Sequence, residues 1–436
     1  VSVSAVMLSG ARPCPHLHCA AMKIGIVGLG YVGLPLAVAF AENDHEVVCF
    51  DLDKAKTTAL SEGRSYIEDI SAETLAPILE RLHPTSRHAD LASCEAIVIC
   101  VPTPLTSARE PDLSYLLDAA AGLAGILQPG QLVVLESTTY PGTTRERVAP
   151  ILEESGLTVG EDFHLAFSPE RIDPGRTDYT VRTTPKLVGG VTDACTERAR
   201  QLYAEICETV VVLTSPEAAE LAKLLENIFR SVNIALVNEL AQLCDRLGID
   251  VWEVIDAAST KPFGFMRFEP GPGMGGHCLP VDPFYLAFKA READFYPEFI
   301  ELAGKVNQAQ PAYCVERIER ALNQTGKPVN GSKVLILGAA YKAGSGDIRE
   351  SPALKILKLL QALEADLAYH DPYVPRLADL GLDSVDLEAS LETADLVVIV
   401  TAHRELDYAE IVERAPLVLD FRGATRDIRS ANLFHL

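Results

Sequence analysis

Short apolar runs alternate with longer amphipathic segments over the first half of the chain. Apolar runs bounded by glycine or polar residues are typical of strands that are buried on both faces of a sheet. The predicted strands are 23–28, 46–51, 96–101, 132–137 and 164–168, and 31–42, rich in small apolar residues, is a predicted helix. Because strands and helices alternate, we expect a parallel sheet with helices on both faces.

The pattern changes between residues 216 and 260. Apolar positions recur at helical spacing through 218–225 and 228–247, with no strand between them. Gly248 is a typical end for such a helix. We expect one long connecting helix here, of a kind that is able to carry a dimer interface.

The alternation of strands and helices restarts after residues 326–332. Four further strands are predicted, at 333–337, 366–370, 395–400 and 417–420. The expected fold class is α/β, with two Rossmann-like parallel-sheet domains joined by a long helical connector. The expected divisions are a non-native or disordered leader at 1–21, a dinucleotide-binding domain at 22–212, a helical central domain at 213–325 and a C-terminal α/β domain at 326–436. A site in the cleft between the domains would collect residues from all three.

Composition narrows the class of protein. The 436 residues are 48% hydrophobic and 23% charged, which is ordinary for a globular protein of two or three domains. The net charge of −23 argues against nucleic acid or an anionic membrane as a partner, and no apolar run is long enough to span a membrane. The ten cysteines lie mostly in apolar segments, as at Cys49, Cys94, Cys100 and Cys244, which is typical of reduced thiols in a cytoplasmic protein.

The first 21 residues precede the natural first strand, and Met22 is the expected start of the protein. A misassigned start or a disordered tail explains this leader better than a metal site does. Its candidate metal ligands are Cys14, His16, His18 and Cys19.

A glycine motif follows the first predicted strand and opens the first helix. It reads Gly28-Leu29-Gly30-Tyr31-Val32-Gly33, and Asp51 ends the next strand. Such glycines permit a tight turn, close approach to a pyrophosphate and helix–strand packing, while the helix N-terminus offers N–H groups to the phosphates. Asp51 is able to accept hydrogen bonds from ribose hydroxyls and would repel a 2′-phosphate, which favours NAD over NADP. The alternative is a glycine turn beside a solvated aspartate.

The C-terminal unit carries only part of this motif. Gly338 follows a predicted strand, and Lys342 and Arg349 flank the polar turn before the next helix. The two cations would neutralise a nucleotide diphosphate. A solvated loop with a local ion pair explains the same residues equally well.

A loop of glycine and proline holds one cysteine. Residues 271–283 read Gly-Pro-Gly-Met-Gly-Gly-His-Cys-Leu-Pro-Val-Asp-Pro, with Cys278 at the centre and Asp282 four residues on. Glycine lets backbone approach a ligand and proline stiffens the loop, so this thiol is placed for nucleophilic attack. The alternative is a small buried hydrophobe. His277 has no second cluster of Cys or His at metal spacing, so we expect no zinc site.

Other polar residues are candidate partners of Cys278. Lys223 and Asn227 stand at i, i+4 on one helix face and are able to hydrogen-bond a developing oxyanion; the alternative is a surface lysine with an asparagine inside the helix. Glu170 follows the strand at 164–168 and is a candidate general base on water, or else a first-turn helix carboxylate. The hydroxyls of segment 136–144, Thr138 among them, suit a ligand-lining loop.

Together these motifs resemble the UDP-glucose/GDP-mannose dehydrogenases, which are NAD-dependent nucleotide-sugar 6-dehydrogenases. The resemblance covers residues 22–436, and the order of so many motifs makes it specific. The segments that carry it are 28–33 with Asp51, 101–104, 136–144, 168–170, Lys223 with Asn227, 275–282, and Lys342 with 347–352.

The resemblance implies a role for each matching residue. Cys278 matches the nucleophile, Lys223 and Asn227 the oxyanion-stabilising pair, and Asp282 a carboxylate that works with the lysine and an ordered water. Glu170 matches the residue assigned to thioester hydrolysis, and Thr138 a hydroxyl that positions water. The implied cofactor-binding residues are Gly28, Gly30, Tyr31, Val32, Gly33, Asp51, Thr103 and Thr138. The implied substrate-binding residues are Glu170, Arg171, Lys223, Asn227, Gly275, Lys342, Arg349 and Arg267, the last reaching the neighbouring subunit's substrate.

The implied reaction oxidises the C6 hydroxyl of a UDP-sugar to the uronate in two hydride transfers to NAD, through a thiohemiacetal and a thioester on Cys278. The product would be a polysaccharide precursor, the C-terminal domain would hold the UDP-sugar, and the protein would be a homodimer or higher homo-oligomer. The residues at 261–265, 276–278 and 173–175 look most like the UDP-N-acetylglucosamine branch. UDP-N-acetylmannosamine and UDP-glucose are the alternative substrates.

Two other functions stay open. A two-electron hydroxyacid dehydrogenase shares the architecture, but it would have neither the cysteine loop nor a second α/β domain. A sensor that binds NAD and a nucleotide sugar without turnover would be favoured by the absence of Cys278, Lys223 or Asp282, and all three are present.

Overall fold

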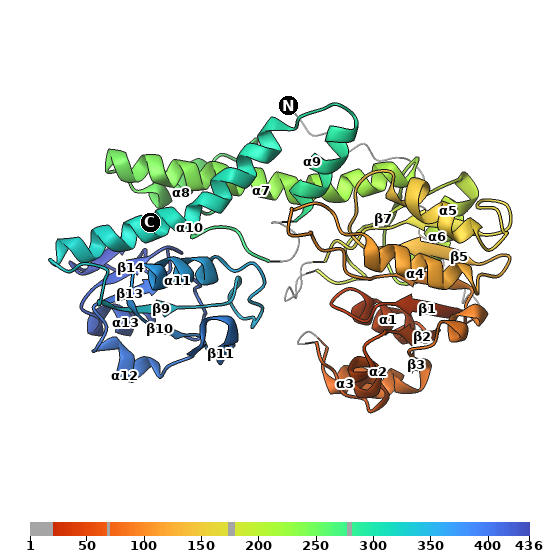
Figure 1. Ribbon diagram of the computed structural model, residues 1–436, viewed down its shortest axis with the longest axis horizontal. Coiled ribbons are helices and arrows are strands. Elements are labelled where there is room, and N and C mark those ends of the chain that lie inside the picture. The colour runs from red at the N-terminus through yellow and green to blue at the C-terminus, as the bar shows by residue number, and fades with distance from the viewer. Residues whose placement is uncertain (1–20, 68–69, 173–178, 277–280) are drawn as a thin grey trace.

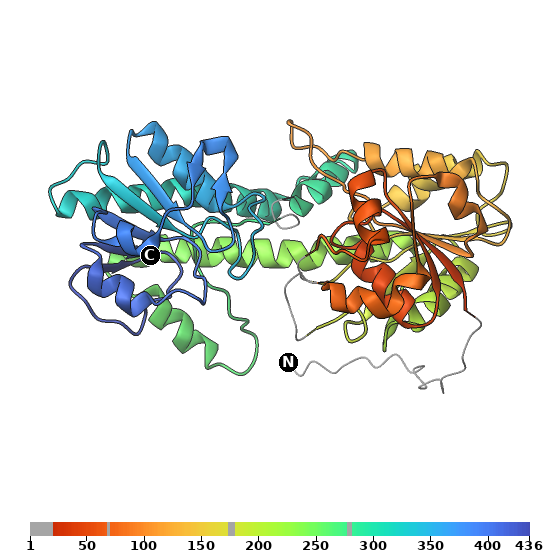
Figure 2. The same cartoon turned by 90° about the horizontal axis from the view of Figure 1, so that it is seen from below.

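The computed structural model describes residues 21–67, 70–172, 179–276 and 281–436. Two α/β units lie toward opposite ends of a pair of long helices, α7 (Pro216–Leu247) and α10 (Glu298–Gln324) (Figure 1, Figure 2). The fold is α/β, with two Rossmann-like domains joined by a long helical connector, as the sequence predicts. Residues 1–20 of the expected leader lie outside the described residues, and so does Cys278.

An eight-stranded sheet forms the N-terminal unit, in the order β3-β2-β1-β4-β5-β6-β7-β8. Apolar side chains form a core cluster on each face of this sheet, which explains the apolar runs in its strands. The strands are β1 (Lys23–Val27), β2 (Glu46–Phe50), β3 (Leu82–Thr85), β4 (Ala96–Ile99), β5 (Leu132–Leu135), β6 (His164–Phe167), β7 (Lys186–Gly190) and β8 (Val210–Val212). The α-helices around it are α1 (Gly33–Glu42), α2 (Lys54–Ser61), α3 (Ala72–Leu75), α4 (Ser114–Ala124), α5 (Ala149–Glu153) and α6 (Asp193–Ala204).

Three strands of this sheet escaped the sequence prediction. β3 contains Pro84, which is tolerated because β3 lies at the edge of the sheet. β8 has only three residues, too few to show a pattern. β7 begins with Lys186, and it pairs antiparallel with β6, with Phe167 opposite Gly189. The described sheet is therefore parallel except between β6 and β7.

The C-terminal unit is a smaller, parallel sheet in the order β10-β9-β13-β14-β15. One face packs against α7, α10 and the short helix α8 (Val251–Ser259), and a separate cluster fills the other face. The strands are β9 (Lys333–Leu337), β10 (Asp366–His370), β13 (Leu396–Ile399), β14 (Val418–Asp420) and β15 (Leu433–His435), with a small hairpin of β11 (Arg376–Leu377) and β12 (Leu382–Asp383). Its α-helices are α11 (Pro352–Ala362), α12 (Leu387–Leu391) and α13 (Tyr408–Arg414).

Local sequence determines both ends of α7. The Ser215 hydroxyl accepts a hydrogen bond from the N–H of Ala218, and Pro216 occupies the first turn. Gly248 ends the helix with a φ of 67°, a left-handed conformation that favours glycine. The predicted long helix is confirmed. It packs on α10 through paired buried amides, including Asn238 with Asn307 at 3.2 Å.

Part of the surface of α7 is apolar and exposed to solvent. Its exposed apolar side chains are Leu221, Leu225, Phe229, Leu236, Leu243 and Leu247. None of the helices in the described ranges is both long enough and apolar enough to cross a membrane. The seven cysteines within these ranges are unpaired and buried.

Candidate active site

The turn between β1 and α1 forms a cradle with room for a ligand. Gly28 has a φ of 96°, and a Cβ there would lie 2.7 Å from the carbonyl oxygen of Cys100. A Cβ on Gly33 would lie 1.8 Å from the carbonyl oxygen of Gly28, so neither position admits a side chain. A Cβ on Gly30 would meet no atom within 4 Å. The first and third glycines therefore serve the turn and the packing, and the second leaves space at the N-terminus of α1, as a bound pyrophosphate requires. Tyr31 and Val32 complete the turn.

Asp51 links the end of β2 to this cradle. Its Oδ2 accepts a hydrogen bond from the N–H of Leu29 at 2.8 Å, and its Oδ1 accepts one from the N–H of Asp53 at 2.9 Å. Lys56 Nζ lies 3.1 Å from Oδ2. The carboxylate is thus fixed beside the glycine turn, as the predicted ribose contact requires, with a cation next to it that the sequence prediction did not consider.

Two loops that follow β4 and β5 are tied together beside the cradle. The Thr103 hydroxyl donates to the carbonyl oxygen of Thr138 at 2.7 Å, and the Tyr285 hydroxyl donates to the carbonyl oxygen of Thr103 at 2.9 Å. Tyr285 belongs to α9 (Asp282–Glu292), so the bond joins these loops to the helix that follows Cys278. Thr138 is half-buried at this junction.

Lys223 and Asn227 lie on the buried face of α7, as their i, i+4 spacing suggests. The Asn227 amide donates to Asp282 Oδ2, and the Asp282 side chain is almost fully buried. Burial raises the pKa of Asp282 to about 6, although the charge of Lys223 and the hydrogen bond from Asn227 act in the opposite direction. A carboxyl with this pKa exchanges a proton close to neutral pH, which suits a general base.

Glu170 stands directly after β6 and also interacts with Lys223. Its Oε1 accepts hydrogen bonds from the N–H groups of Arg171 and Ile172, at 2.8 and 2.5 Å. Burial acts to raise the pKa of Glu170, but Lys186, the two N–H donors and Lys223 together hold it below its ordinary value. Glu170 is therefore ionised at neutral pH. The Arg171 guanidinium turns to Glu226 on α7, at 2.7 Å.

The glycine loop before Cys278 packs tightly against the C-terminal domain. A Cβ on Gly275 would lie 2.7 Å from the Cβ of Tyr341 and 3.2 Å from the carbonyl oxygen of Glu350. A Cβ on Gly276, whose φ is 93°, would lie 3.0 Å from the Tyr341 ring. Cys278 itself lies outside the described residues, but Gly276 before it and Val281 after it both line the cavity described next.

A cavity of about 800 Å³ lies where the three parts of the chain meet. Arg109 of the N-terminal domain, Met274 and Gly276 of the glycine loop, and Arg349 of the C-terminal domain are among its lining residues. The expectation that a site between the domains collects residues from all three agrees with this cavity. Across the described ranges, no group of three His, Cys, Asp or Glu side chains is arranged to hold a metal ion.

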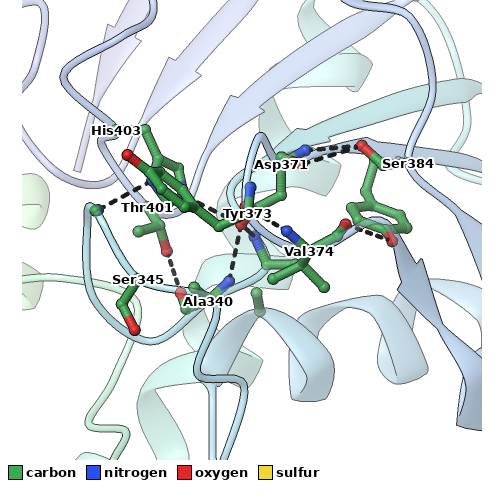
Figure 3. Close-up of polar contacts among 12 residues, drawn as sticks. Ala340, Ser345, Asp371, Tyr373, Val374, Ser384, Thr401 and His403 are labelled. Atoms are coloured by element: carbon green, nitrogen blue, oxygen red, sulfur yellow. Dashed lines mark hydrogen bonds and ion pairs between the residues drawn. The ribbon is translucent and has the colours of Figure 1, made fainter. Parts of the chain in front are cut away.

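A buried polar network shapes the loop that carries Lys342 (Figure 3). Asp371, at the end of β10, accepts hydrogen bonds from the N–H groups of Ala339 and Ala340, at 2.7 and 3.0 Å. His403 Nε2 lies 3.0 Å from the same oxygen, and His403 Nδ1 lies 3.2 Å from the N–H of Gly344. Burial opposes ionisation of Asp371, yet the His403 bond and the backbone donors lower its pKa to about 2. Asp371 thus holds the first loop of the C-terminal unit as Asp51 holds that of the N-terminal unit.

Arg349 bridges the two domains. It pairs with Asp347, and its guanidinium carbon lies 5.1 Å from the centre of the Tyr31 ring, within reach of a cation–π contact with the turn between β1 and α1. Lys342 is half-buried on the neighbouring loop. Arg267 lies further away, after α8, where it pairs with Asp256 and with Glu269 of its own chain.

The family is decided by comparison with known proteins. Residues 22–207 match the NAD binding domain, 217–309 the central domain and 335–427 the UDP binding domain of the UDP-glucose/GDP-mannose dehydrogenase family. The chain belongs to this family. The resemblance inferred from its motifs is confirmed, and the protein is an NAD-dependent oxidoreductase.

Similar members of this dehydrogenase family match along nearly the whole chain. The UDP-N-acetyl-D-mannosamine dehydrogenase of Pyrococcus horikoshii is 36% identical, over 93% of this chain and 99% of its own. The UDP-N-acetyl-D-glucosamine 6-dehydrogenase of Pseudomonas aeruginosa is also 36% identical, over 88% of this chain and 91% of its own. A solved structure of a UDP-D-ManNAc dehydrogenase from Pyrococcus horikoshii has a TM-score of 0.88 at 34% identity, covering 95% of this chain and 99% of its own.

Sequence reasoning missed two charged residues of this dehydrogenase. Lys186 and Glu136 are buried behind Glu170, where their side chains form an ion pair at 3.0 Å. A signal was present, because a lysine opens the apolar run of β7 and a glutamate directly follows the apolar run of β5. A charge next to a buried strand needs a partner.

Proposed function

We propose that this dehydrogenase oxidises the C6 hydroxyl of a UDP-sugar to the uronate, removing four electrons through intermediates bound to Cys278. One observation carries the proposal: Lys223, Asn227, Asp282 and Glu170 come from three separate segments and interact with one another, and Asp282 stands four residues after Cys278 in the chain. Bound NAD supplies the hydride acceptor for both oxidations, and the glycine cradle with Asp51 would hold it.

The chain's own residues divide the remaining chemistry. Asp282, with Lys223 beside it, takes the proton of the sugar hydroxyl during the first oxidation. The Cys278 thiolate then forms a bond to the aldehyde carbon, and Lys223 and Asn227 stabilise the oxygen that becomes negative. After the second oxidation the sugar is a thioester on sulfur.

Hydrolysis of the thioester is assigned to Glu170. Water forms a bond to the thioester carbon while Glu170 takes a proton from it. The carbon–sulfur bond breaks, the uronic acid leaves, and the electron pair stays on the Cys278 sulfur as thiolate. Covalent capture keeps the aldehyde from escaping and divides a difficult reaction into easier steps. Thr138 is assigned to positioning the water, and Lys342, Arg349, Arg171 and Gly275 to the nucleotide-sugar side.

The sugar that we propose is UDP-N-acetylglucosamine. Residues 261–265 and the Gly276-His277-Cys278 context support it, and so does the similarity to a UDP-N-acetyl-D-glucosamine 6-dehydrogenase. Equal similarity to a UDP-N-acetyl-D-mannosamine dehydrogenase makes the mannosamine epimer the second candidate, and UDP-glucose the third. We further propose that the enzyme makes a polysaccharide precursor, works in the cytoplasm and assembles through α7, with domains at 22–212, 213–325 and 326–436.

Stoichiometry tests the chemistry, and a substrate panel tests the sugar. NADH should appear at two equivalents per sugar with no free aldehyde, and kcat/KM should be highest for UDP-N-acetylglucosamine. Cys278→Ala should retain at most a slow first oxidation, and Glu170→Gln should accumulate a thioester that adds mass to the intact protein. One NADH per sugar, or full activity in Cys278→Ala, would return the chain to a two-electron dehydrogenase. NAD and sugar binding without any NADH would favour the sensor.

A further inference from the structure

A buried lysine stands behind Glu170. Lys186 Nζ lies 3.5 Å from Glu170 Oε2 and 3.0 Å from Glu136 Oε2. The side chains of Lys186 and Glu136 are 6% and 0% exposed, whereas that of Glu170 is 18% exposed. Glu170 alone of the three is therefore open to a ligand or to water, and the other two form the wall behind it.

The antiparallel strand β7 brings this lysine to the site. Ala166 pairs with Gly190 and Phe167 with Gly189, and the same register continued beyond β6 sets Lys186 opposite Glu170. A parallel β7 would have placed its first residue at the far edge of the sheet. Glu136 reaches the same point because it directly follows β5, which pairs with β6 in parallel, Leu135 opposite Phe167.

We propose that Lys186, supported by Glu136, is a positioning residue for thioester hydrolysis, which keeps the Glu170 carboxylate ionised and aimed so that it accepts a proton from water. The inference rests on the role proposed above for Glu170. It adds two residues that make no contact with the reacting atoms and act only through that carboxylate.

Glu220 shows what burial does without such a cation. Its carboxylate accepts hydrogen bonds from the N–H groups of Gly142 and Thr144 and from the Thr144 hydroxyl. Even with these donors, burial raises the pKa of Glu220 to about 7. Glu170 accepts only two backbone hydrogen bonds, but the ammonium group of Lys186 lies beside it. The pKa of Glu170 is below its ordinary value. A general base with the pKa of Glu220, about 7, would be half protonated at neutral pH.

Glu136 shares the charge of the lysine with Glu170, and the thiols near the lysine carry no charge. Burial raises the pKa of Glu136 even though the charge of Lys186 and a hydrogen bond donated by Tyr203 of α6 act to lower it, so Glu136 takes up a proton before Glu170 does as the pH falls. Burial also raises the pKa of the thiols of Cys100 and Cys207, which are therefore neutral. Lys186 lies 5.0 Å from the centre of the Tyr203 ring. From α7, Lys223 adds a second positive charge that also acts to lower the pKa of Glu170.

A charge-balanced variant tests the proposal. Lys186→Met with Glu136→Gln removes one positive and one negative charge together, so no unpaired ion is left in the core apart from Glu170 itself. The rate of thioester hydrolysis in a single turnover is measured from the mass of the intact protein at pH values from 5 to 8. In the double variant this rate should be lower than in the wild type at the acidic end of the range. We expect the pH below which the rate falls to move up by about 1 to 3 units, with the rate decreasing about tenfold per pH unit below it, and an unchanged KM for the sugar. The single variant Lys186→Arg keeps the positive charge, so its pH dependence should lie between those of the wild type and the double variant.

A folded double variant whose acid limb coincides with that of the wild type would overturn the proposal. The wild-type protein offers a second test that needs no turnover and no folded core variant. The infrared carboxylate band that disappears in Glu170→Gln should titrate below about pH 4.3, the ordinary value for glutamate. A band that titrates at or above that value would also overturn it. Failure of every UDP-sugar to yield NADH would refute the proposed function and leave the infrared result standing.

Discussion

The N–H of Gly276 donates a hydrogen bond to the carbonyl oxygen of Arg349 at 3.0 Å. This bond joins the loop that precedes Cys278 to the C-terminal domain. The glycines around it have no room for side chains, because Tyr341 and the backbone at Glu350 approach them closely. The C-terminal domain therefore forms one wall around Gly275 and Gly276, the residues that lead to the proposed nucleophile.

The first prediction concerns this wall. Gly275→Ala places a Cβ 2.7 Å from the Cβ of Tyr341, so the loop must shift. A displacement of the nucleophile by about 1 Å costs about 100-fold in rate, and we expect kcat to fall by that order while NAD binding is unchanged. Gly125→Ala is the control, since its nearest neighbour is 4.0 Å away. Equal kcat values for the two variants would contradict the packing role. Steady-state kinetics and NAD titration make the comparison.

The second prediction concerns Asp282. Because its pKa is raised to about 6, the folded protein binds a proton there that the unfolded chain releases near pH 4. The free energy of unfolding should therefore fall, through this group, as pH rises from about 4 to about 6. Asp282→Asn keeps the acceptor for Asn227 and should be more stable at pH 7 by about 2 kcal/mol, and inactive. Urea unfolding of both proteins at pH 4 and pH 7 measures the difference. A constant difference between the two pH values would contradict the raised pKa.

The third prediction concerns cofactor choice. Asp51→Ala should raise the KM for NAD by about tenfold, because the ribose hydroxyls lose their hydrogen bonds to a charged carboxylate. The preference for NAD over NADP should also become smaller. The structure adds a reason: with the carboxylate gone, Lys56 is left to attract a 2′-phosphate. Asp53→Ser, which keeps an N-cap for α2, is the matched control. Equal turnover with NAD and NADP in the wild type would show that Asp51 does not determine the choice of cofactor.

The fourth prediction concerns α7. Leu225 is 62% exposed in the apolar stripe of that helix, and a second copy of the chain would cover it. Leu225→Glu should convert a dimer to a monomer in sedimentation at micromolar concentration. Leu359→Glu, on α11 and 39% exposed, should leave the assembly unchanged. A wild-type protein that sediments as a monomer would refute assembly through this helix.

The sequence by itself determined the features that depend on neighbouring residues. The apolar runs placed the first residues of β1, β2, β4, β5 and β6 correctly, and Gly248 marked the end of α7. The glycine motif with Asp51 predicted the turn between β1 and α1 and the NAD binding domain around it, since its geometry needs only a strand, a turn and a helix in order. The motif order also identified the family. Each of these strands, helix ends and motifs is encoded in neighbouring residues and is read from the spacing and type of those residues.

Only the tertiary structure decided which distant charges meet. Lys186 faces Glu170 because one strand runs antiparallel, and nothing in the local pattern of β7 shows its direction. The raised pKa of Asp282 and the lowered pKa of Glu170 follow from burial and from partners far away in the chain. The tight fit of Gly275 depends on Tyr341, in another domain. Burial and the distance between charges depend on how separate elements pack, and short-range residue patterns do not contain that information.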